Sequence, residues 1–197
     1  MKLATGIVFL FGLFAAPGVR DRAFYAPPAA SIIVAAGSLS QPADDVPVIV
    51  NAPHLQLTLT HSGHVLTPGM DVRLIVDIQV AQDVHVYAQG VKTYKPLQLT
   101  IDPIPGAEPA LPSYPKSKLL FLKSTNEHVP VFEGMFRVVQ DVNIQSSQEF
   151  MTSLQPKGKT ITVTGELKYQ ACTLKVCFLP ASVQLKWELQ VVPLGRD

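Results

Sequence analysis

His54-Leu55-Gln56-Leu57-Thr58-Leu59-Thr60 alternates apolar and polar residues along its whole length. Because successive side chains of a β-strand point to opposite faces, a period of two predicts a strand that is buried on one side only. The leucines would share the face toward a hydrophobic core, and the polar side chains would face solvent. This stretch therefore predicts one strand of a sheet that covers a core.

Similar runs, rich in Val, Ile, Leu and Thr, recur along the rest of the chain. Further strands are expected at residues 74–80, 83–87, 97–101, 129–144, 160–169 and 183–192. Turns containing glycine or proline separate them, and no stretch after the N-terminal region keeps a helical period for three turns. This pattern predicts an all-β fold, an immunoglobulin-like antiparallel β-sandwich. Residues 183–189 are the expected partner of the strand at 160–169.

The N-terminal region has a different composition. Lys2 precedes an apolar run from Leu3 to Ala16, and a charged segment follows, which is the order of a signal peptide. The run is shorter than the roughly 20 apolar residues of a spanning helix, so a membrane anchor is the second interpretation. We expect a signal peptide or N-terminal anchor at residues 1–25, a linker at 26–47 and the folded domain at 48–197. The protein is then exported, and it is periplasmic or otherwise extracytoplasmic, with tethering to the membrane as an alternative.

Charge and motif content exclude several function classes. The formal net charge is +1 with both signs scattered, so there is no basic face for nucleic acid. The five histidines do not follow the cysteine-histidine spacing of zinc sites, and we expect no metal. Neither a glycine-rich phosphate loop nor a serine nucleophile elbow occurs, so no small-molecule cofactor is expected.

The chain has two cysteines, Cys172 and Cys177, with four residues between them. A disulfide that closes so small a loop stabilises a fold by only about 2 kcal/mol in the chain-entropy model, so it is a weak structural link. Thiol exchange, in contrast, needs a second sulfur close enough to resolve a mixed disulfide. Lys175, between the two thiols, favours a thiolate by its charge. We interpret the pair as a reversible disulfide; a structural disulfide at a hairpin end and two buried free thiols are the alternatives.

The segment Lys168-Tyr169-Gln170-Ala171-Cys172-Thr173-Leu174-Lys175-Val176-Cys177-Phe178-Leu179-Pro180 resembles the cysteine motif of one family, the N-terminal periplasmic domain of the thiol:disulfide interchange protein DsbD. His85-Val86-Tyr87 resembles the aromatic-rich strand that lies near the cysteine pair in this family, and Leu97-Gln98-Leu99 fits a later strand. The resemblance covers approximately residues 48–192, and the cysteine motif is its most specific part.

The resemblance implies a domain that accepts electrons from a membrane-embedded thiol carrier and passes them to oxidised periplasmic proteins, including thioredoxin-like proteins. Cys172 and Cys177 would be the redox pair, and Cys177 the sulfur that forms the interchain bond. We expect six residues to contact the partner or the sulfurs: Tyr87, His85, Phe121, Tyr169, Lys175 and Phe178. The chain has no Cys-x-x-Cys motif, so it is expected to act as one part of a relay with separate proteins.

In the family, a cap loop with an aromatic residue shields the disulfide from unwanted exchange. The corresponding region is expected between Leu119 and Val131, where Phe121 stands at a shifted position and is the expected shield.

The alternative function is a noncatalytic immunoglobulin-like module that binds a partner or has a structural role, in which the disulfide only closes a loop.

Overall fold

The computed structural model describes residues 46–63, 66–123, 125–148, 150 and 160–191. The predicted signal peptide and almost all of the predicted linker lie outside these residues. In the described residues there are twelve strands, namely β1 (Val48–Ala52), β2 (Leu55–His61), β3 (Asp71–Val80), β4 (His85–Tyr87), β5 (Gln98–Ile101), β6 (Ala107–Pro109), β7 (Lys118–Leu122), β8 (Glu127–Phe132), β9 (Met135–Ile144), β10 (Thr160–Tyr169), β11 (Ala171–Cys172) and β12 (Ala181–Gln190). In this described part, no helix is long and apolar enough to span a membrane.

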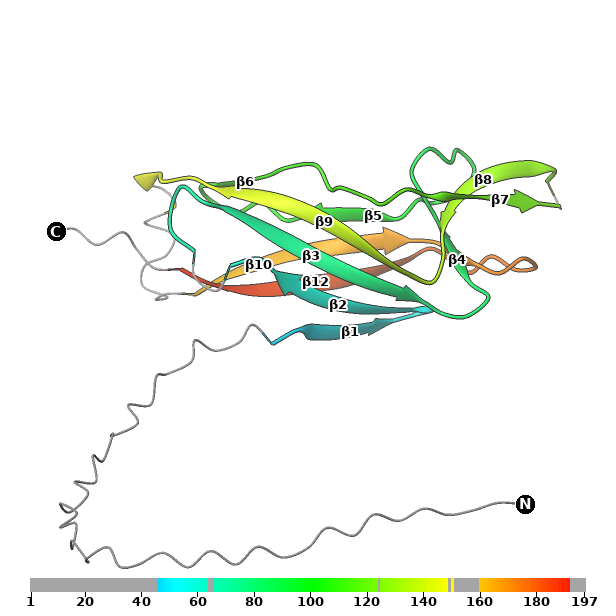
Figure 1. Cartoon of the computed structure of the whole chain (residues 1–197), viewed down its shortest axis with the longest axis horizontal. Helices are drawn as coiled ribbons and strands as arrows, with labels where there is room; N and C mark the ends of the chain where they lie inside the picture. Colours follow the sequence, from blue (N-terminus) through cyan, green and yellow to red (C-terminus); the bar gives the residue numbers. More distant parts are fainter. Residues whose placement is uncertain (1–45, 64–65, 124, 149, 151–159, 192–197) are drawn as a thin grey trace, which may run out of the picture. The chain divides into compact units, whose positions relative to one another are not determined.

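The strands form three sheets, and every strand-to-strand ladder in them is antiparallel. The first has the order β1-β2-β3-β9-β6, the second β12-β10-β5, and the third β11-β4-β8-β7. Figure 1 shows β3 and β9 of the first sheet running over β10 and β12 of the second. The prediction of an immunoglobulin-like antiparallel β-sandwich is confirmed.

Alternating burial places the main core between the first two sheets. Along β3 the exposure pattern changes at almost every residue, and β12 shows the same period of two. Trp187 is buried, and its indole Nε1 donates a hydrogen bond to the carbonyl oxygen of Thr60 at 3.1 Å, which joins β12 to β2. Apolar faces of both sheets thus share one core, as the sequence pattern predicted.

The expected pair of strands at the C-terminal side is confirmed, because β10 pairs with β12 from Thr160 opposite Gln190 to Tyr169 opposite Ala181. The single strand expected at 129–144 is wrong. The chain turns at Glu133 and Gly134, so that β8 and β9 join different sheets. Gly134 has a φ of 66°, a left-handed conformation that glycine adopts without a steric penalty.

The third sheet lies at the end of the domain that carries the cysteines. It consists of β4, the β7–β8 hairpin and the short strand β11, which ends at Cys172. In Figure 1, β7 and β8 extend at the same end as the orange loop that follows β10. The fold therefore brings a second hairpin to the segment that contains the cysteine pair.

Candidate functional site

The cysteines face each other across a small β-hairpin and are joined by a disulfide. Two backbone hydrogen bonds flank them: the Thr173 amide donates to the Val176 carbonyl at 2.8 Å, and the Phe178 amide donates to the Ala171 carbonyl at 2.9 Å. This arrangement makes Cys172 and Cys177 a non-hydrogen-bonded pair, the position in an antiparallel ladder where opposite side chains are closest. The backbone itself thus brings the two sulfurs together.

A threonine side chain closes the turn between the cysteines. Thr173 Oγ1 accepts hydrogen bonds from the backbone amides of Lys175 at 3.2 Å and Val176 at 3.0 Å. Hydroxyl groups commonly stabilise turns by such local bonds to the backbone. The turn therefore has its own stabilising contacts, independent of the disulfide.

The two sulfur-bearing residues have opposite environments. Cys172 has 0% exposure and packs in a small apolar cluster with Tyr87, Leu122, Val129 and Val131, separate from the main core. Cys177 is exposed. Since a disulfide is broken by attack on one of its sulfurs, access from solvent favours attack at Cys177.

Tyr87 on β4 contacts the exposed sulfur. Its hydroxyl lies 3.6 Å from Cys177 Sγ and is the donor, because a sulfur in a disulfide carries no hydrogen. The Tyr94 ring stacks on the Tyr87 ring, with centroids 4.1 Å apart and planes 6° apart. Burial, followed by the interaction with Tyr94, raises the pKa of Tyr87 well above its ordinary value. Tyr87 therefore keeps its proton and remains a donor throughout the physiological pH range.

His85 lies on the same strand, directly opposite Cys172 in the β4–β11 ladder. Its side chain meets the Tyr87 ring edge to face, with centroids 5.4 Å apart. Only 2% of the residue is exposed, and its Nε2 has no hydrogen-bond partner among the described residues. Burial lowers the pKa of His85, and the charge of Glu133 acts in the opposite direction. His85 is thus a buried imidazole whose neutral form is favoured.

Two other expected contact residues also lie on the hairpin or next to it. Lys175 is exposed in the turn. Phe178 is half-buried, and its ring stacks on His54 with centroids 3.9 Å apart. These two residues, together with Tyr87 and His85, are brought to the cysteine hairpin.

Tyr169 and Phe121 are not brought to it. Tyr169 is 1% exposed in the main core, where its hydroxyl donates to the Pro53 carbonyl at 2.7 Å. Phe121 is 43% exposed and packs against His128, with ring centroids 4.9 Å apart. Because neighbouring Leu120 and Leu122 pack into the cluster around Cys172, alternation along β7 turns Phe121 to the opposite face. The expected shielding by Phe121 is therefore not what the structure shows.

The cluster around Cys172 is covered by residues that the sequence interpretation missed. Leu120, Tyr94 and Val91 pack against it as partly buried side chains. Tyr94 lies in the connection between β4 and β5, where an aromatic residue beside Lys95-Pro96 interrupts a polar stretch. That isolated aromatic residue was the available signal, but its stacking on Tyr87 depends on the tertiary structure.

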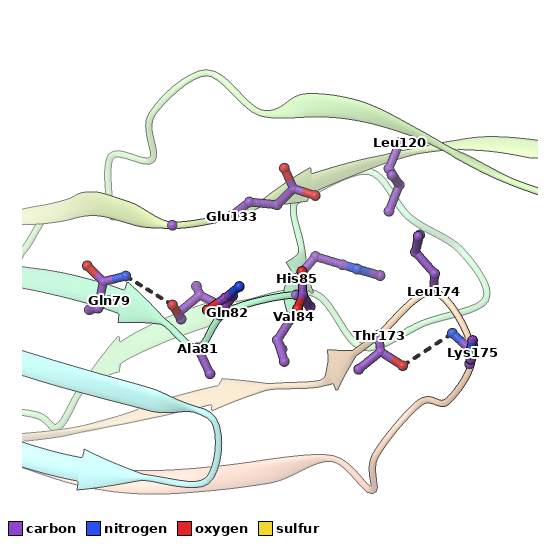
Figure 2. Close-up of a pocket in the computed structure, with 13 residues that line it drawn as sticks. Gln79, Ala81, Gln82, Val84, His85, Leu120, Glu133, Thr173, Leu174 and Lys175 are labelled. Carbon is purple, nitrogen blue, oxygen red and sulfur yellow. Dashed lines mark hydrogen bonds between the residues drawn. The ribbon is translucent and has the colours of Figure 1, made fainter.

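A pocket of about 820 Å³ opens beside the hairpin, on a side where neither cysteine lines it. Its walls are the chain from Gln79 to His85, Leu120 on β7, Glu133-Gly134 in the β8–β9 turn, and Thr173-Leu174-Lys175 in the cysteine turn. In Figure 2 the labelled side chains around this pocket come from separate elements of the fold. One wall of the pocket is thus the segment that joins the two cysteines.

The solved structures to which this chain is similar include two N-terminal domains. The N-terminal periplasmic domain of ScsB from Proteus mirabilis has 12% identity and a TM-score of 0.47, with 72% of this chain and 49% of that chain covered. The DsbD N-terminal domain of Neisseria meningitidis, in the reduced form, has 14% identity and a TM-score of 0.40, with coverage of 59% and 77%. This chain thus spans about half the length of the ScsB structure. No curated protein sequence matches the chain.

The family comparison covers most of the described domain. The model named "Thiol:disulfide interchange protein DsbD, N-terminal" matches residues 58–188, from β2 to near the end of β12. The matched range includes Tyr87, the β7–β8 hairpin and both cysteines, and the resemblance seen in the cysteine motif is confirmed. The chain belongs to the family of the N-terminal domain of the thiol:disulfide interchange protein DsbD.

Proposed function

We propose that the chain is a periplasmic thiol-disulfide exchange domain, which receives electrons from a membrane-embedded thiol carrier and reduces oxidised proteins of the cell envelope. The observation that carries this proposal is the asymmetry of the disulfide: Cys177 is exposed, whereas Cys172 is buried behind it. A purely structural bond gains nothing from an exposed sulfur. A disulfide that exchanges needs one sulfur that a partner protein can reach and a second sulfur that later resolves the mixed disulfide.

Reduction of the domain begins with a thiolate of the carrier, which attacks Cys177 Sγ. The bond to Cys172 breaks, Cys172 leaves with the electron pair and takes up a proton, and Cys177 is held in a mixed disulfide. The second thiolate of the carrier then attacks the carrier's other sulfur, which is bonded to Cys177, and Cys177 is released as a thiolate. The domain has gained two electrons, and the carrier is left with a disulfide.

Delivery of the electrons reverses these roles. The Cys177 thiolate attacks a disulfide of an oxidised protein, such as a thioredoxin-like protein, and one substrate thiol is released. Cys172 then loses its proton and attacks Cys177 Sγ, which releases the second substrate thiol and re-forms the intramolecular disulfide. Tyr87 donates a hydrogen bond to the Cys177 sulfur, and the charge of Lys175 in the turn favours the thiolate. Phe178, His85 and the hairpin surface are the proposed contacts with the partner.

A redox titration of the purified domain tests the function. We expect a midpoint well above about −300 mV, the value below which structural disulfides typically lie. A midpoint below that value would support the noncatalytic module, in which the disulfide only closes a loop. Equilibration with dithiothreitol, followed by separation of the two redox forms after acid quenching, provides the measurement.

Two single-cysteine variants test the assigned order of attack. Cys172→Ser leaves the exposed thiol, and we expect it to react with a bulky aromatic disulfide reagent at least about tenfold faster than the buried thiol left by Cys177→Ser. Only Cys172→Ser should accumulate a mixed disulfide with a protein substrate. Equal rates for both variants would contradict the assignment. Trapping of the substrate by Cys177→Ser alone would reverse it.

A further inference from the structure

The pocket beside the cysteine hairpin contains a polar group that the exchange reaction does not use. His85 lines it, and the buried Nε2 atom has no hydrogen-bond partner among the described residues. A buried nitrogen without a partner is unfavourable, and such groups are rare in folded proteins. A ligand that supplies a hydrogen bond would satisfy it.

The remaining walls define the chemistry of this ligand. Glu133 contributes a carboxylate at the β8–β9 turn, close enough to His85 for its charge to affect the imidazole. Leu120 and Leu174 contribute apolar surface, and Leu174 is 73% exposed. Figure 2 shows these four side chains around the same pocket. The combination of acceptors and an apolar wall suits a long aliphatic side chain with a cationic end.

The Glu133 carboxylate already forms an ion pair with a lysine of this chain. Lys118 Nζ lies 3.6 Å from Glu133 Oε2, with the two side chains 71% and 39% exposed. An ion pair that is so exposed and so long is weak, and an incoming cation can replace it. Asp83 adds a second carboxylate to the pocket wall, whereas Lys175 in the turn is the one cation among the described lining residues.

From these contacts we infer that the pocket binds a lysine or arginine side chain of the partner protein that exchanges with the disulfide. The aliphatic part of that side chain lies against Leu120 and Leu174, and its cationic end lies between the Glu133 carboxylate and His85 Nε2. This inference rests on the proposed function for the identity of the partner. Because Thr173-Leu174-Lys175 is both a wall of the pocket and the link between the cysteines, binding places the partner next to Cys177.

The test uses the oxidised domain and a small probe, Nα-acetyl-lysine N-methylamide, with the norleucine analogue as the uncharged control. Titration followed by NMR should show saturable shifts of the His85 ring and of the Gly134 and Thr173 amides. We expect the lysine probe to bind about fivefold more tightly than the norleucine probe at neutral pH. Equal affinities, or shifts that fall elsewhere on the domain, would overturn the inference.

Variants assign the effect to the pocket. Glu133→Gln, an exposed and nearly isosteric change that preserves the fold, should reduce the affinity for the lysine probe to that for norleucine. Glu188→Gln is the matched control, since Glu188 is also exposed and paired with a lysine, but on β12. The same loss in both variants would mean that general surface charge explains binding, and the inference would fail.

A separate measurement distinguishes this inference from the proposed function. Reduction of the wild-type protein by dithiothreitol, which has no cationic side chain, measures disulfide exchange without use of the pocket. If the probe binds but the disulfide resists exchange, the proposed function fails and the binding site stands. If exchange is normal and the lysine probe has no advantage, only the inferred site fails.

Discussion

The Tyr87 hydroxyl lies 3.6 Å from Cys177 Sγ, although the two residues are 90 positions apart in the chain. The contact exists because β11 pairs with β4, and the cysteine hairpin continues from β11. A phenol that keeps its proton is thereby held against the exposed sulfur. After reduction, the same hydroxyl would donate to a thiolate, where a hydrogen bond is stronger than to a neutral sulfur.

Tyr87→Phe tests this contact. A hydrogen bond to a charged group contributes about 1.5 kcal/mol, so its loss should reduce the thiolate fraction of Cys177 roughly tenfold at neutral pH. The rate of alkylation of the reduced protein by iodoacetamide, measured against pH, reports that fraction. Tyr114→Phe is the control, because Tyr114 bonds to the Leu99 amide instead. A similar effect of both variants would argue against a specific role for Tyr87.

Tyr94→Ala tests which side chain covers the disulfide. Removal of the ring stacked on Tyr87 should admit water to the cluster around Cys172 and make Cys172 a better leaving group. We expect reduction by glutathione to become about threefold faster or more, since leaving-group stability controls exchange rates. Phe121→Ala, on the opposite face of β7, should leave the rate unchanged. Faster reduction in Phe121→Ala but not in Tyr94→Ala would instead support the sequence prediction that Phe121 shields the disulfide.

The lowered pKa of His85 predicts a pH-dependent stability. In the unfolded chain a histidine takes up its proton near pH 6.5, whereas burial opposes protonation in the folded domain. The contribution of His85 to the free energy of unfolding should therefore be constant above that pH and should fall as the pH decreases from about 6.5 through the lower folded value. Urea unfolding at pH 7.5 and pH 5 measures the difference.

His85→Gln removes the titrating group and should make the loss of stability toward pH 5 smaller than in wild type. The exposed His128 provides the control, since His128→Gln should preserve the wild-type pH dependence. Glu133 opposes the effect of burial, so Glu133→Gln should make the decrease in stability steeper. An unchanged pH profile in His85→Gln would contradict this assignment.

Gly165 on β10 is required by a close approach of β5. A Cβ at this position would lie 2.5 Å from the Thr100 carbonyl oxygen and 2.9 Å from Ile101 Cδ1. Gly165→Ala should therefore destabilise the domain by about 1–3 kcal/mol, the usual range for overpacking. The midpoint of urea unfolding measures this. A midpoint equal to that of wild type would show that β5 moves aside at no cost.

The fold was predictable where one face of a strand is buried. The alternating leucines of β2 and the pattern of β10 with β12 led directly to the observed strands. The prediction failed at residues 129–144, where apolar residues continue on both sides of the turn and only Gly134 marks it. β7 was also missed, because Leu119-Leu120-Phe121-Leu122 is apolar throughout and shows no alternation. The faces of such a strand are decided by its neighbours.

The candidate site was predictable where its geometry depends on residues that are close in the sequence. The cysteine spacing indicated a hairpin pair, because residues close in sequence determine that geometry. The roles of Tyr94 and Leu120 depend on contacts between distant segments, and no local pattern encodes them. Tyr169 stands beside the cysteine motif in the sequence, yet strand alternation turns it into the core.

The hydrogen bonds to the Thr173 hydroxyl and the two backbone hydrogen bonds that flank the cysteines stabilise the turn, and none of them involves a sulfur atom. If the disulfide opens as proposed, we expect these contacts to keep the two thiols close together. Ring closure then needs no conformational search and proceeds at a high effective concentration. We therefore expect a mixed disulfide with a partner protein to be resolved quickly.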